Sequence, residues 1–385
     1  MRVLFSSTRD HGHVFPMVPL ARAVSAAGHE VLWASHPEAC ALVDRAGIDT
    51  TPAGLRGEEF GSLTGEVLRR AQAASPADRS AFLFPAMFGA VLTPPTLADL
   101  LPLARAWEPD LLVHEQGELA SPLVGALLGV PSVTHSFGGA VPPLILADAG
   151  RRLTGLWAGY GLTIPPHAGC FEAPFLDICP PSVQPVPTDH IAVVEQLRPE
   201  SWAGPEVELP AGLDGGAPLV YLTLGTVRTY PAAMQAAVQA AVRAVSDLPV
   251  RVLVTVGPRG DPAELGPQPG HVTVLRYLPQ GQVLPLCAVV VSHGGSGTFL
   301  GALAHGLPQL CLPQAADQFR TAGAGERAGV ALALHPDEAS TEAVRAAVAR
   351  LLGDDSFGHA ARPVATEIAG MPSPAEVVPL LKALV

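Results

Sequence analysis

The sequence holds a single lysine, Lys382, among its 385 residues. A Walker-type phosphate loop needs the pair Gly-Lys, so the sequence excludes this class of nucleotide site. Schiff-base catalysis, which uses a lysine amine, is disfavoured for the same reason. Any bound phosphate must therefore be held by backbone amides, hydroxyls, a histidine or an arginine.

Positive charge as a whole is scarce. The chain has 23 Lys and Arg against 35 Asp and Glu, which gives a net charge of −12. This balance argues against a nucleic acid or an anionic membrane as partner. No apolar run of about 18 uninterrupted residues occurs, so we expect no membrane span. The first residues are strand-like and lack the apolar region of a secretory signal, and we expect a cytoplasmic protein.

Cysteines are few, scattered and odd in number, and none forms a Cys-x-x-Cys pair. This pattern favours buried free thiols in a reducing cytoplasm over disulfides or structural zinc. The length of 385 residues, with 48% hydrophobic and 15% charged residues, is typical of a compact chain with two domains. The five cysteines are Cys40, Cys170, Cys179, Cys287 and Cys311.

The most informative segment is 289–298, Val-Val-Val-Ser-His-Gly-Gly-Ser-Gly-Thr. A short β-branched run followed by glycines predicts a buried parallel strand that leads into a helix. Ser296 and Thr298 are candidate caps for a helix from Thr298 to Ala304, which ends at Gly306. Free amides at a helix start, with hydroxyls and a histidine beside them, are typical of a phosphate site. The alternative is a turn that needs glycine for its geometry only.

Strands and helices alternate along both halves of the chain, which predicts parallel sheets covered on both faces. Residues 55–105 form an irregular stretch of short helices and loops, and residues 138–190 are rich in Pro and Gly. The loop 8–15 after the first strand has no G-x-G-x-x-G, so a dinucleotide site is not supported there. The expected strands are 2–7, 30–34, 111–114, 132–135, 219–224, 250–256, 272–276, 289–292 and 309–312, and the expected helices are 16–27, 116–128, 231–246, 298–304, 317–328 and 341–352.

Polar groups follow several of these strands, where ligands bind in such sheets. His11 and His13 follow the first strand, Glu115 follows a later one, and His293 follows the strand before the glycines. A histidine beside a carboxylate is a plausible general base with its orienting partner. The alternatives are structural histidines or, for His11-x-His13, a metal pair, although no third ligand is evident at metal-site spacing.

Two weaker signals lie in the second half. Asp317 and Gln318 stand at the start of a helix, where an aspartate cap is the simpler interpretation and contact with sugar hydroxyls the functional one. Gly225-Thr226 follows a strand and is either a turn or a second phosphate contact.

Together these segments resemble the family 1 glycosyltransferases of the GT-B fold. More narrowly, the chain is similar to actinobacterial enzymes that glycosylate antibiotics and related natural products. The matching pieces follow the family order over nearly the whole chain. They are HGHVFP (11–16), PDLLVHE (109–115), HSFG (135–138), DICPPS (177–182), LTLGT (222–226), YLPQ (277–280), HGGSGT (293–298) and PQAADQ (313–318).

The resemblance implies an α/β protein of the GT-B fold, with two Rossmann-like domains whose parallel sheets face a central cleft. We expect an acceptor-binding domain at 1–200, a linker at 201–217 and a nucleotide-sugar domain at 218–365. Residues 366–385 are expected to pack back onto the first domain.

The resemblance also assigns roles to residues. His13 would be the base that deprotonates an acceptor hydroxyl, oriented by Glu115, which replaces the usual aspartate and is one methylene longer. Asp317 and Gln318 match the pair that holds the donor sugar. The donor nucleotide and diphosphate would be held by Thr226, Leu278, Gln280, His293, Gly295, Ser296, Gly297 and Thr298. We expect acceptor contacts from His11, Phe82, Phe88, Ser136 and Phe137.

The implied reaction is an inverting, single displacement that transfers a deoxysugar from a dTDP- or UDP-sugar to a hydroxyl of a hydrophobic natural product such as a polyketide. It needs no metal and no further cofactor, and the absence of an Asp-x-Asp motif agrees with this. Two rival functions stay open, a non-catalytic auxiliary protein of this fold and an epimerase or hydrolase of nucleotide sugars. The acceptor, the sugar, the type of linkage and the oligomeric state, including a homodimer, also stay open.

Overall fold

The computed structural model describes residues 1–73, 81–200, 202, 204–213, 215–223, 225, 232–258 and 260–385. The chain divides into two compact units. The C-terminal segment that belongs to the first unit starts at Met371, whereas residue 366 was expected. Residues 201–217, the expected linker, belong to the second unit. The first unit consists of Met1–Cys179, Val186–Arg198 and Met371–Val385, and the second of Pro180–Pro185 and Pro199–Gly370.

The first unit contains a seven-stranded sheet with the order β3-β2-β1-β4-β5-β6-β7. All its pairings are parallel, so the carboxyl ends of the strands share one edge. The four expected strands are present, and three short strands were not predicted (β3, β6 and β7). The strands are β1 (Arg2–Ser6), β2 (Glu30–Ser35), β3 (Asp49–Pro52), β4 (Leu111–Glu115), β5 (Ser132–His135), β6 (Phe175–Asp177) and β7 (Val194–Gln196).

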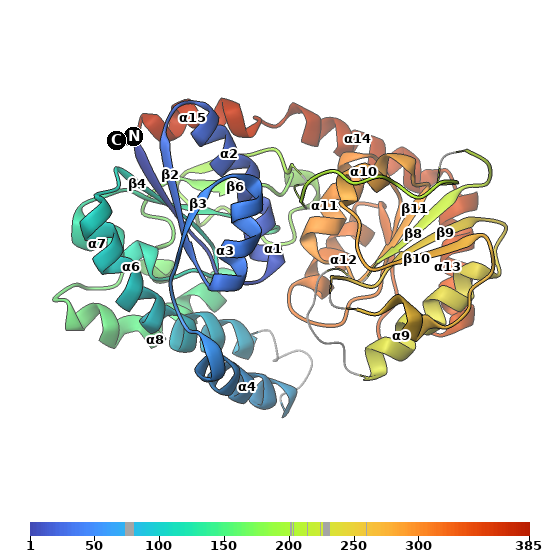
Figure 1. The fold of residues 1–385 in the computed structure, drawn as a ribbon, viewed down its shortest axis with the longest axis horizontal. Coiled ribbons are helices and arrows are strands. Elements are labelled where there is room, and N and C mark those ends of the chain that lie inside the picture. Colours follow the sequence, from blue (N-terminus) through green and yellow to red (C-terminus); the bar gives the residue numbers. More distant parts are fainter. Residues whose placement is uncertain are drawn as a thin grey trace. The chain divides into compact units, whose positions relative to one another are not determined.

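Helices cover both faces of this sheet (Figure 1). Leu4 of β1 belongs to a core cluster that β4 and the helices α6, α7 and α8 complete, whereas the neighbouring Phe5 stacks on Trp33 with ring centroids 5.4 Å apart. Alternate side chains of one strand thus enter two cores. The helical segments are α1 (His11–Val14), η1 (Phe15–Met17), α2 (Val18–Ala26), α3 (Pro37–Val43), η2 (Asp44–Ala46), α4 (Gly57–Ala73), η3 (Pro85–Leu92), α6 (Thr93–Trp107), α7 (Ser121–Leu128), α8 (Pro143–Gly159), η4 (Pro166–Gly169) and α15 (Pro374–Lys382).

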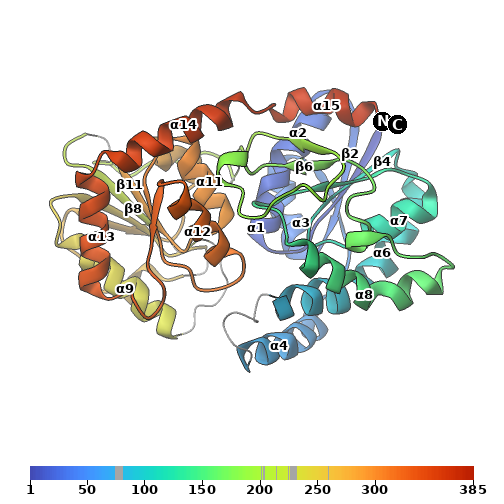
Figure 2. The ribbon, with the colours of Figure 1, turned by 180° about the vertical axis from the view of Figure 1, so that it is seen from behind.

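One expectation about the first unit was wrong, and one helix was not predicted. The stretch 55–105 is not a set of short helices and loops, because α4 and α6 span 17 and 15 residues. The stretch 138–190 includes the 17-residue helix α8, whose first residue, Pro143, stands where proline is tolerated. The last helix, α15, packs beside α2, with both chain termini nearby (Figures 1 and 2).

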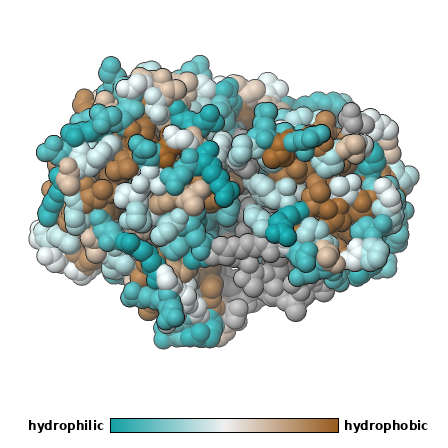
Figure 3. Space-filling view, viewed as in Figure 1, coloured by the Kyte–Doolittle hydropathy of each residue, from teal (hydrophilic) through white to brown (hydrophobic). Residues whose placement is uncertain are grey.

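One helical stretch, Ala81–Trp107, is long and apolar enough by length and composition to cross a membrane. This differs from the expectation of no such segment. Of its most hydrophobic window 28% is buried, and Leu97 and Leu100 are fully or almost fully buried in the first unit. On the face drawn in Figure 3, hydrophobic side chains lie scattered among hydrophilic ones over both units.

The second unit contains a six-stranded parallel sheet with the order β10-β9-β8-β11-β12-β13. The expected strands are present, and β13 is an addition. The strands are β8 (Leu219–Thr223), β9 (Arg251–Thr255), β10 (Val272–Leu275), β11 (Val289–Ser292), β12 (Gln309–Cys311) and β13 (Ala331–Ala333). The helical segments are η5 (Pro181–Val183), α9 (Ala232–Ser246), η6 (Pro262–Leu265), α10 (Gln280–Val283), η7 (Leu284–Leu286), α11 (Ser296–Ala304), α12 (Gln318–Arg327), α13 (Thr341–Gly353) and α14 (Ser356–Gly370).

Strand β8 shows why this sheet is buried on both faces. Val220 and Leu222 belong to a core cluster shared with α9 and α13, while Leu219 and Tyr221 belong to a second cluster with residues of α10 and α11. A strand with two buried faces reads as a continuous apolar run, which is why these strands were predictable.

Candidate active site

His13 lies just beyond the carboxyl end of β1. The expected loop 8–15 is helical from His11 onwards, because α1 begins there and runs into η1 and α2. This early helix places the His13 ring toward β4, with Nδ1 3.1 Å from Oε2 of Glu115. The structure therefore brings together the two residues predicted to act as base and orienting partner.

Glu115 ends β4 and is fully buried. Its Oε1 accepts hydrogen bonds from the Thr8 amide at 3.0 Å and the Thr8 hydroxyl at 2.8 Å. Its Oε2 accepts from the Gly117 amide at 2.5 Å and faces His13. Burial raises the pKa of this carboxyl, but the charge and hydrogen bond of His13 and the two amides lower the pKa below its ordinary value. The group is therefore an ionised acceptor beside the imidazole.

Aromatic rings enclose His13 on two sides. The Phe137 ring lies 4.5 Å and the Phe88 ring 5.3 Å from the His13 ring, between centroids. Phe88 comes from η3 and Phe137 from the loop after β5. Gln116 fixes that loop, since its amide oxygen accepts from the Val141 amide at 2.9 Å. His13 thus lies in apolar surroundings, which suit a hydrophobic ligand.

The other predicted acceptor residues are His11, Ser136 and Phe82. His11 packs edge-to-face on Phe15, with centroids 5.0 Å apart. Ser136 is fully buried, accepts from the Ile178 amide at 2.8 Å and donates to Asp177 at 3.3 Å, so its hydroxyl joins β5 to β6. Phe82 is half-buried in the helical stretch before η3.

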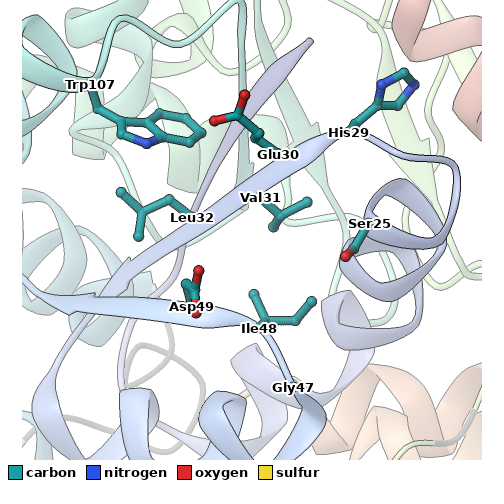
Figure 4. Close-up of a pocket in the computed structure, with 9 residues that line it drawn as sticks. All are labelled: Ser25, His29, Glu30, Val31, Leu32, Gly47, Ile48, Asp49 and Trp107. Carbon is teal, nitrogen blue, oxygen red and sulfur yellow. The ribbon is translucent and has the colours of Figure 1, made fainter.

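A pocket of about 280 Å³ lies at the opposite edge of the same sheet (Figure 4). It is lined by residues at the start of β2 and β3, including Glu30 and Asp49, and by Trp107. Both carboxylates are exposed, and in Figure 4 that of Glu30 lies next to the Trp107 ring. This pocket is therefore separate from the group around His13.

In the second unit, helix α11 starts at the carboxyl end of β11. It begins at Ser296, two residues earlier than expected, with Gly295 at the cap position and no side-chain cap. Ser296 and Thr298 are therefore not caps. The first amide bonded within the helix is that of Phe299, which donates to Gly295 at 3.0 Å. The amides before it lie at the positive end of the helix dipole, where a diphosphate binds well.

The glycines beside this helix make room for the His293 ring. A Cβ on Gly295 would overlap Nε2 of His293, and a Cβ on Gly225 would lie 2.6 Å from its Cε1. Gly225 also has a φ of +74°, which favours glycine. Nothing lies within 4 Å of a Cβ added to Gly297, so that glycine has no such steric role. The imidazole is thus packed between two backbone segments at the start of α11.

His293 is 8% exposed, and its Nδ1 is buried without a hydrogen-bond partner among the described residues. Burial lowers the pKa of His293 to about 4, although the nearby Asp317 acts in the opposite direction. The ring is therefore neutral at pH 7 and has one N–H to donate. A buried unpaired imidazole nitrogen is costly, so the site favours a ligand group that pairs with it.

Gln280, Thr298 and Leu278 are three further predicted donor residues. Gln280 and Thr298 bond each other, with the Gln280 amide nitrogen 2.9 Å from the Thr298 hydroxyl. Leu278 is 5% exposed and packs in a core cluster, while its backbone amide and carbonyl have no partner within the described residues. These free backbone groups suit pairing with a nucleotide base.

Asp317 and Gln318 lie at the start of α12. The Asp317 side chain does not cap this helix but accepts from the Ser296 hydroxyl at 2.9 Å. The Gln318 oxygen accepts from the amides of Gln314 and Ala315 at 2.8 and 3.0 Å, so its NH₂ is the end left for a ligand. The pair thus offers one acceptor and one donor beside the first turn of α11. The predicted contact Thr226 lies outside the described residues.

Two contacts of Glu115 were missed in the sequence, those with Thr8 and Gly117. Thr8 follows β1 directly, and a polar residue at a strand end was the signal that could have identified it. Among the described residues no cluster of three or more potential metal ligands is found.

Comparison with known proteins identifies the family of the chain. The family described as erythromycin biosynthesis protein CIII-like matches with its N-terminal domain at residues 22–207 and its C-terminal domain at residues 237–384. Aklavinone 7-beta-L-rhodosaminyltransferase of Streptomyces galilaeus is 32% identical, over 100% of this chain and 96% of the relative.

Solved structures are similar over the whole chain. The glycosyltransferase SsfS6 of Streptomyces sp. SF2575, in complex with thymidine diphosphate, has a TM-score of 0.81 and 30% identity, covering 100% of this chain and 99% of that one. Spinosyn rhamnosyltransferase SpnG, in complex with spinosyn aglycone, has a TM-score of 0.82 and 30% identity, covering 99% and 100%. The chain therefore belongs to the EryCIII-like family of antibiotic glycosyltransferases, has their GT-B fold and is a sugar-transferring enzyme.

Proposed function

We propose that this enzyme transfers a deoxysugar, with inversion, from a dTDP- or UDP-sugar to a hydroxyl of a hydrophobic aglycone of the polyketide type. The observation that carries the proposal is the His13–Glu115 pair, with Nδ1 and Oε2 3.1 Å apart between two phenylalanine rings. A histidine oriented by a buried carboxylate is a general base for removing a hydroxyl proton.

The reaction is a single displacement at the anomeric carbon. Nε2 of His13, the ring nitrogen that does not face Glu115, takes the proton of the acceptor hydroxyl as its oxygen attacks. The new bond joins this oxygen to the anomeric carbon, while the bond from that carbon to the diphosphate oxygen breaks. The nucleoside diphosphate leaves with the bonding electrons. Attack opposite the leaving group inverts the configuration.

Glu115 assists by stabilising the imidazolium that forms. It is ionised and buried, and its remaining lone pairs accept from Thr8 and Gly117, so its orientation is fixed. A fixed charge in a water-poor site acts more strongly than one in solvent.

The leaving diphosphate is stabilised in the second unit. The first amides of α11 and the His293 N–H are groups that would bind its developing negative charge. The Asp317 carboxylate accepts hydrogen bonds from the sugar hydroxyls. The Gln318 NH₂ donates to them, because the Gln318 oxygen already accepts from two backbone amides. Thymidine diphosphate in the SsfS6 complex supports a dTDP donor. The mechanism as proposed uses no metal ion.

The apolar surroundings of His13 support a hydrophobic acceptor. Phe88 belongs to the apolar stretch Ala81–Trp107, whose first half is only partly buried in the core. Half-buried aromatic side chains beside a polar group are typical of sites for apolar ligands. The aglycone bound to SpnG and the sugar named for the aklavinone enzyme support an acceptor and a donor of these classes.

A direct transfer assay tests the proposal. Purified protein is incubated with a dTDP- or UDP-deoxysugar and a panel of hydroxylated polyketide aglycones, with and without EDTA. We expect a product heavier by one deoxysugar residue, equal rates with EDTA, and the inverted anomer by proton NMR. Release of nucleoside diphosphate without any glycoside would instead indicate a hydrolase.

A further inference from the structure

We propose that Thr8 is a positioning residue of the transfer reaction, which adapts the site to a glutamate as the partner of the base. The inference rests on the proposed function of His13 and Glu115. Its starting point is that Glu115 is one methylene longer than an aspartate, so its carboxylate has an additional rotatable bond. Unless other groups restrain this bond, the oxygen facing His13 is not fixed.

Thr8 supplies that restraint through two hydrogen bonds to one oxygen. Its amide and its hydroxyl donate to Oε1 of Glu115 at 3.0 and 2.8 Å. With Oε1 held in this way, Oε2 is directed to the opposite side, where it lies 3.1 Å from Nδ1 of His13. The division of donors between the two oxygens thus sets the orientation of the carboxylate plane.

The room for the longer side chain comes from Gly117. Its amide donates to Oε2 at 2.5 Å. A Cβ at this position would lie 3.1 Å from Oε2 and 3.1 Å from the Phe88 ring, closer than most Cβ contacts. Gly117 therefore allows the carboxylate and the aromatic wall to approach the same backbone.

Thr8 is itself held in place by the adjacent strand. The Ser35 hydroxyl of β2 donates to the Ser7 carbonyl at 2.7 Å, and the Trp33 indole donates to the Ser7 hydroxyl at 3.0 Å. These groups are buried. The backbone at the end of β1 is thus fixed, and the Thr8 hydroxyl can restrain Glu115 without a large entropic cost.

The test compares Thr8→Val, which keeps the shape and removes the hydroxyl donor, with Thr8→Ser, which keeps the donor. Thr50→Val is the matched control, because it also removes a threonine hydroxyl that donates to a carboxylate. Thr50 lies on β3, and its hydroxyl donates to the exposed Asp44 carboxylate at 2.7 Å. We expect Thr8→Val to lower kcat by about tenfold, the typical effect of one hydrogen bond to a charged group. KM for the nucleotide sugar should be unchanged, and Thr8→Ser should recover most of kcat.

A second readout does not depend on activity. Nitrogen-15 NMR of the histidine rings reports which nitrogen of His13 carries the proton. In the wild type and in Thr8→Ser we expect the proton on Nδ1, facing Glu115, whereas Thr8→Val should show a mixture of tautomers. The same mixture is expected in Glu115→Asp, whose shorter carboxylate does not reach both partners. Thr8→Val should then add little in the Glu115→Asp background.

The outcomes separate the two proposals. If the wild type transfers no sugar but the tautomers follow this pattern, the proposed function fails and the positioning role of Thr8 stands. If Thr8→Val keeps the Nδ1 tautomer and full kcat, the positioning role is wrong. An equal loss of kcat in Thr8→Val and Thr50→Val would also overturn the positioning role. So would a fully additive loss of kcat in the double variant of Thr8→Val and Glu115→Asp. Should Thr8→Val fail to fold, Thr8→Ala, which also lacks the hydroxyl donor, takes its place, and the Nδ1 tautomer with full kcat in that variant would overturn the positioning role.

Discussion

The Ser296 hydroxyl donates to the Asp317 carboxylate at 2.9 Å, so the first turn of α11 is joined to the start of α12. This bond connects a residue of the proposed diphosphate site with one of the proposed sugar site. It also explains why Asp317 does not cap its own helix. The proposed diphosphate site and the proposed sugar site are thus joined by a side-chain hydrogen bond.

Asp317→Asn should separate sugar binding from nucleotide binding. The amide oxygen still accepts from Ser296, but the charge that holds sugar hydroxyls is lost. We expect KM for the nucleotide sugar to rise by about tenfold, since a hydrogen bond to a charged group contributes about 1.5–3 kcal/mol. The Kd for dTDP, measured by calorimetry, should stay the same. A comparable loss of dTDP affinity would show that Asp317 acts on the diphosphate site instead.

Gly295→Ala should weaken nucleotide binding through His293. The added Cβ would overlap Nε2 of that ring, which must then move away from the start of α11. We expect the Kd for dTDP to rise at least tenfold. Gly353→Ala in α13 is the control, because nothing lies within 4 Å of its added Cβ. Equal dTDP affinity in both variants would contradict the role given to the His293 ring.

Glu115→Gln should reduce transfer strongly, because a neutral amide does not stabilise the imidazolium of His13. General-base catalysis contributes about 10²–10⁴-fold, and we expect a loss of at least about 10²-fold in kcat. Single-turnover kinetics with saturating donor measures this step. Near-normal kcat in a folded variant would remove Glu115 from the mechanism.

Stability should fall as the pH falls, because burial opposes the protonation of two histidines, His135 and His293. Burial lowers the pKa of both His135 and His293 to about 4, against 6.5 in the unfolded chain. Between pH 6.5 and 4 the unfolded chain binds protons that the folded chain does not. The free energy of unfolding is therefore greatest above pH 6.5 and falls below it, by up to about 1.4 kcal/mol per pH unit for each histidine.

Urea titrations at pH 7.5, 6 and 5 measure this dependence. The variant His135→Gln should lose less stability than the wild type over that range, because it has one buried titrating group fewer. Identical slopes for the two proteins would show that His135 does not remain neutral in the folded state.

The strands that position the site were predictable because they are buried on both faces. β4, β8 and β11 begin as apolar runs, and the polar residues at their ends predict the candidate site. Two of the missed strands, β3 and β7, carry no such signal, whereas β6 and β13 are largely apolar but only three residues long. β3 reads Asp-Thr-Thr-Pro and β7 reads Val-Glu-Gln, so their pairing is set by the sheet beside them.

The surroundings of His13 were less predictable. Phe88 and Phe137 reach His13 from η3 and from the loop after β5, and their rings meet only once the helices fold around the sheet. Helix α8 was missed because its segment is rich in glycine and proline, although Leu146, Leu153 and Trp157 are buried along one side. The contacts of Glu115 with Thr8 and Gly117 depend on side-chain geometry, which sequence patterns do not specify.

The measurement that most directly tests the central claim compares the wild type with His13→Ala. Sugar transfer is followed by mass spectrometry, and dTDP binding by calorimetry, on the same preparations. The account predicts that His13→Ala abolishes transfer and leaves the Kd for dTDP nearly unchanged, because the base and the donor site belong to different units. Equal transfer by the variant and the wild type with a genuine acceptor would contradict the account.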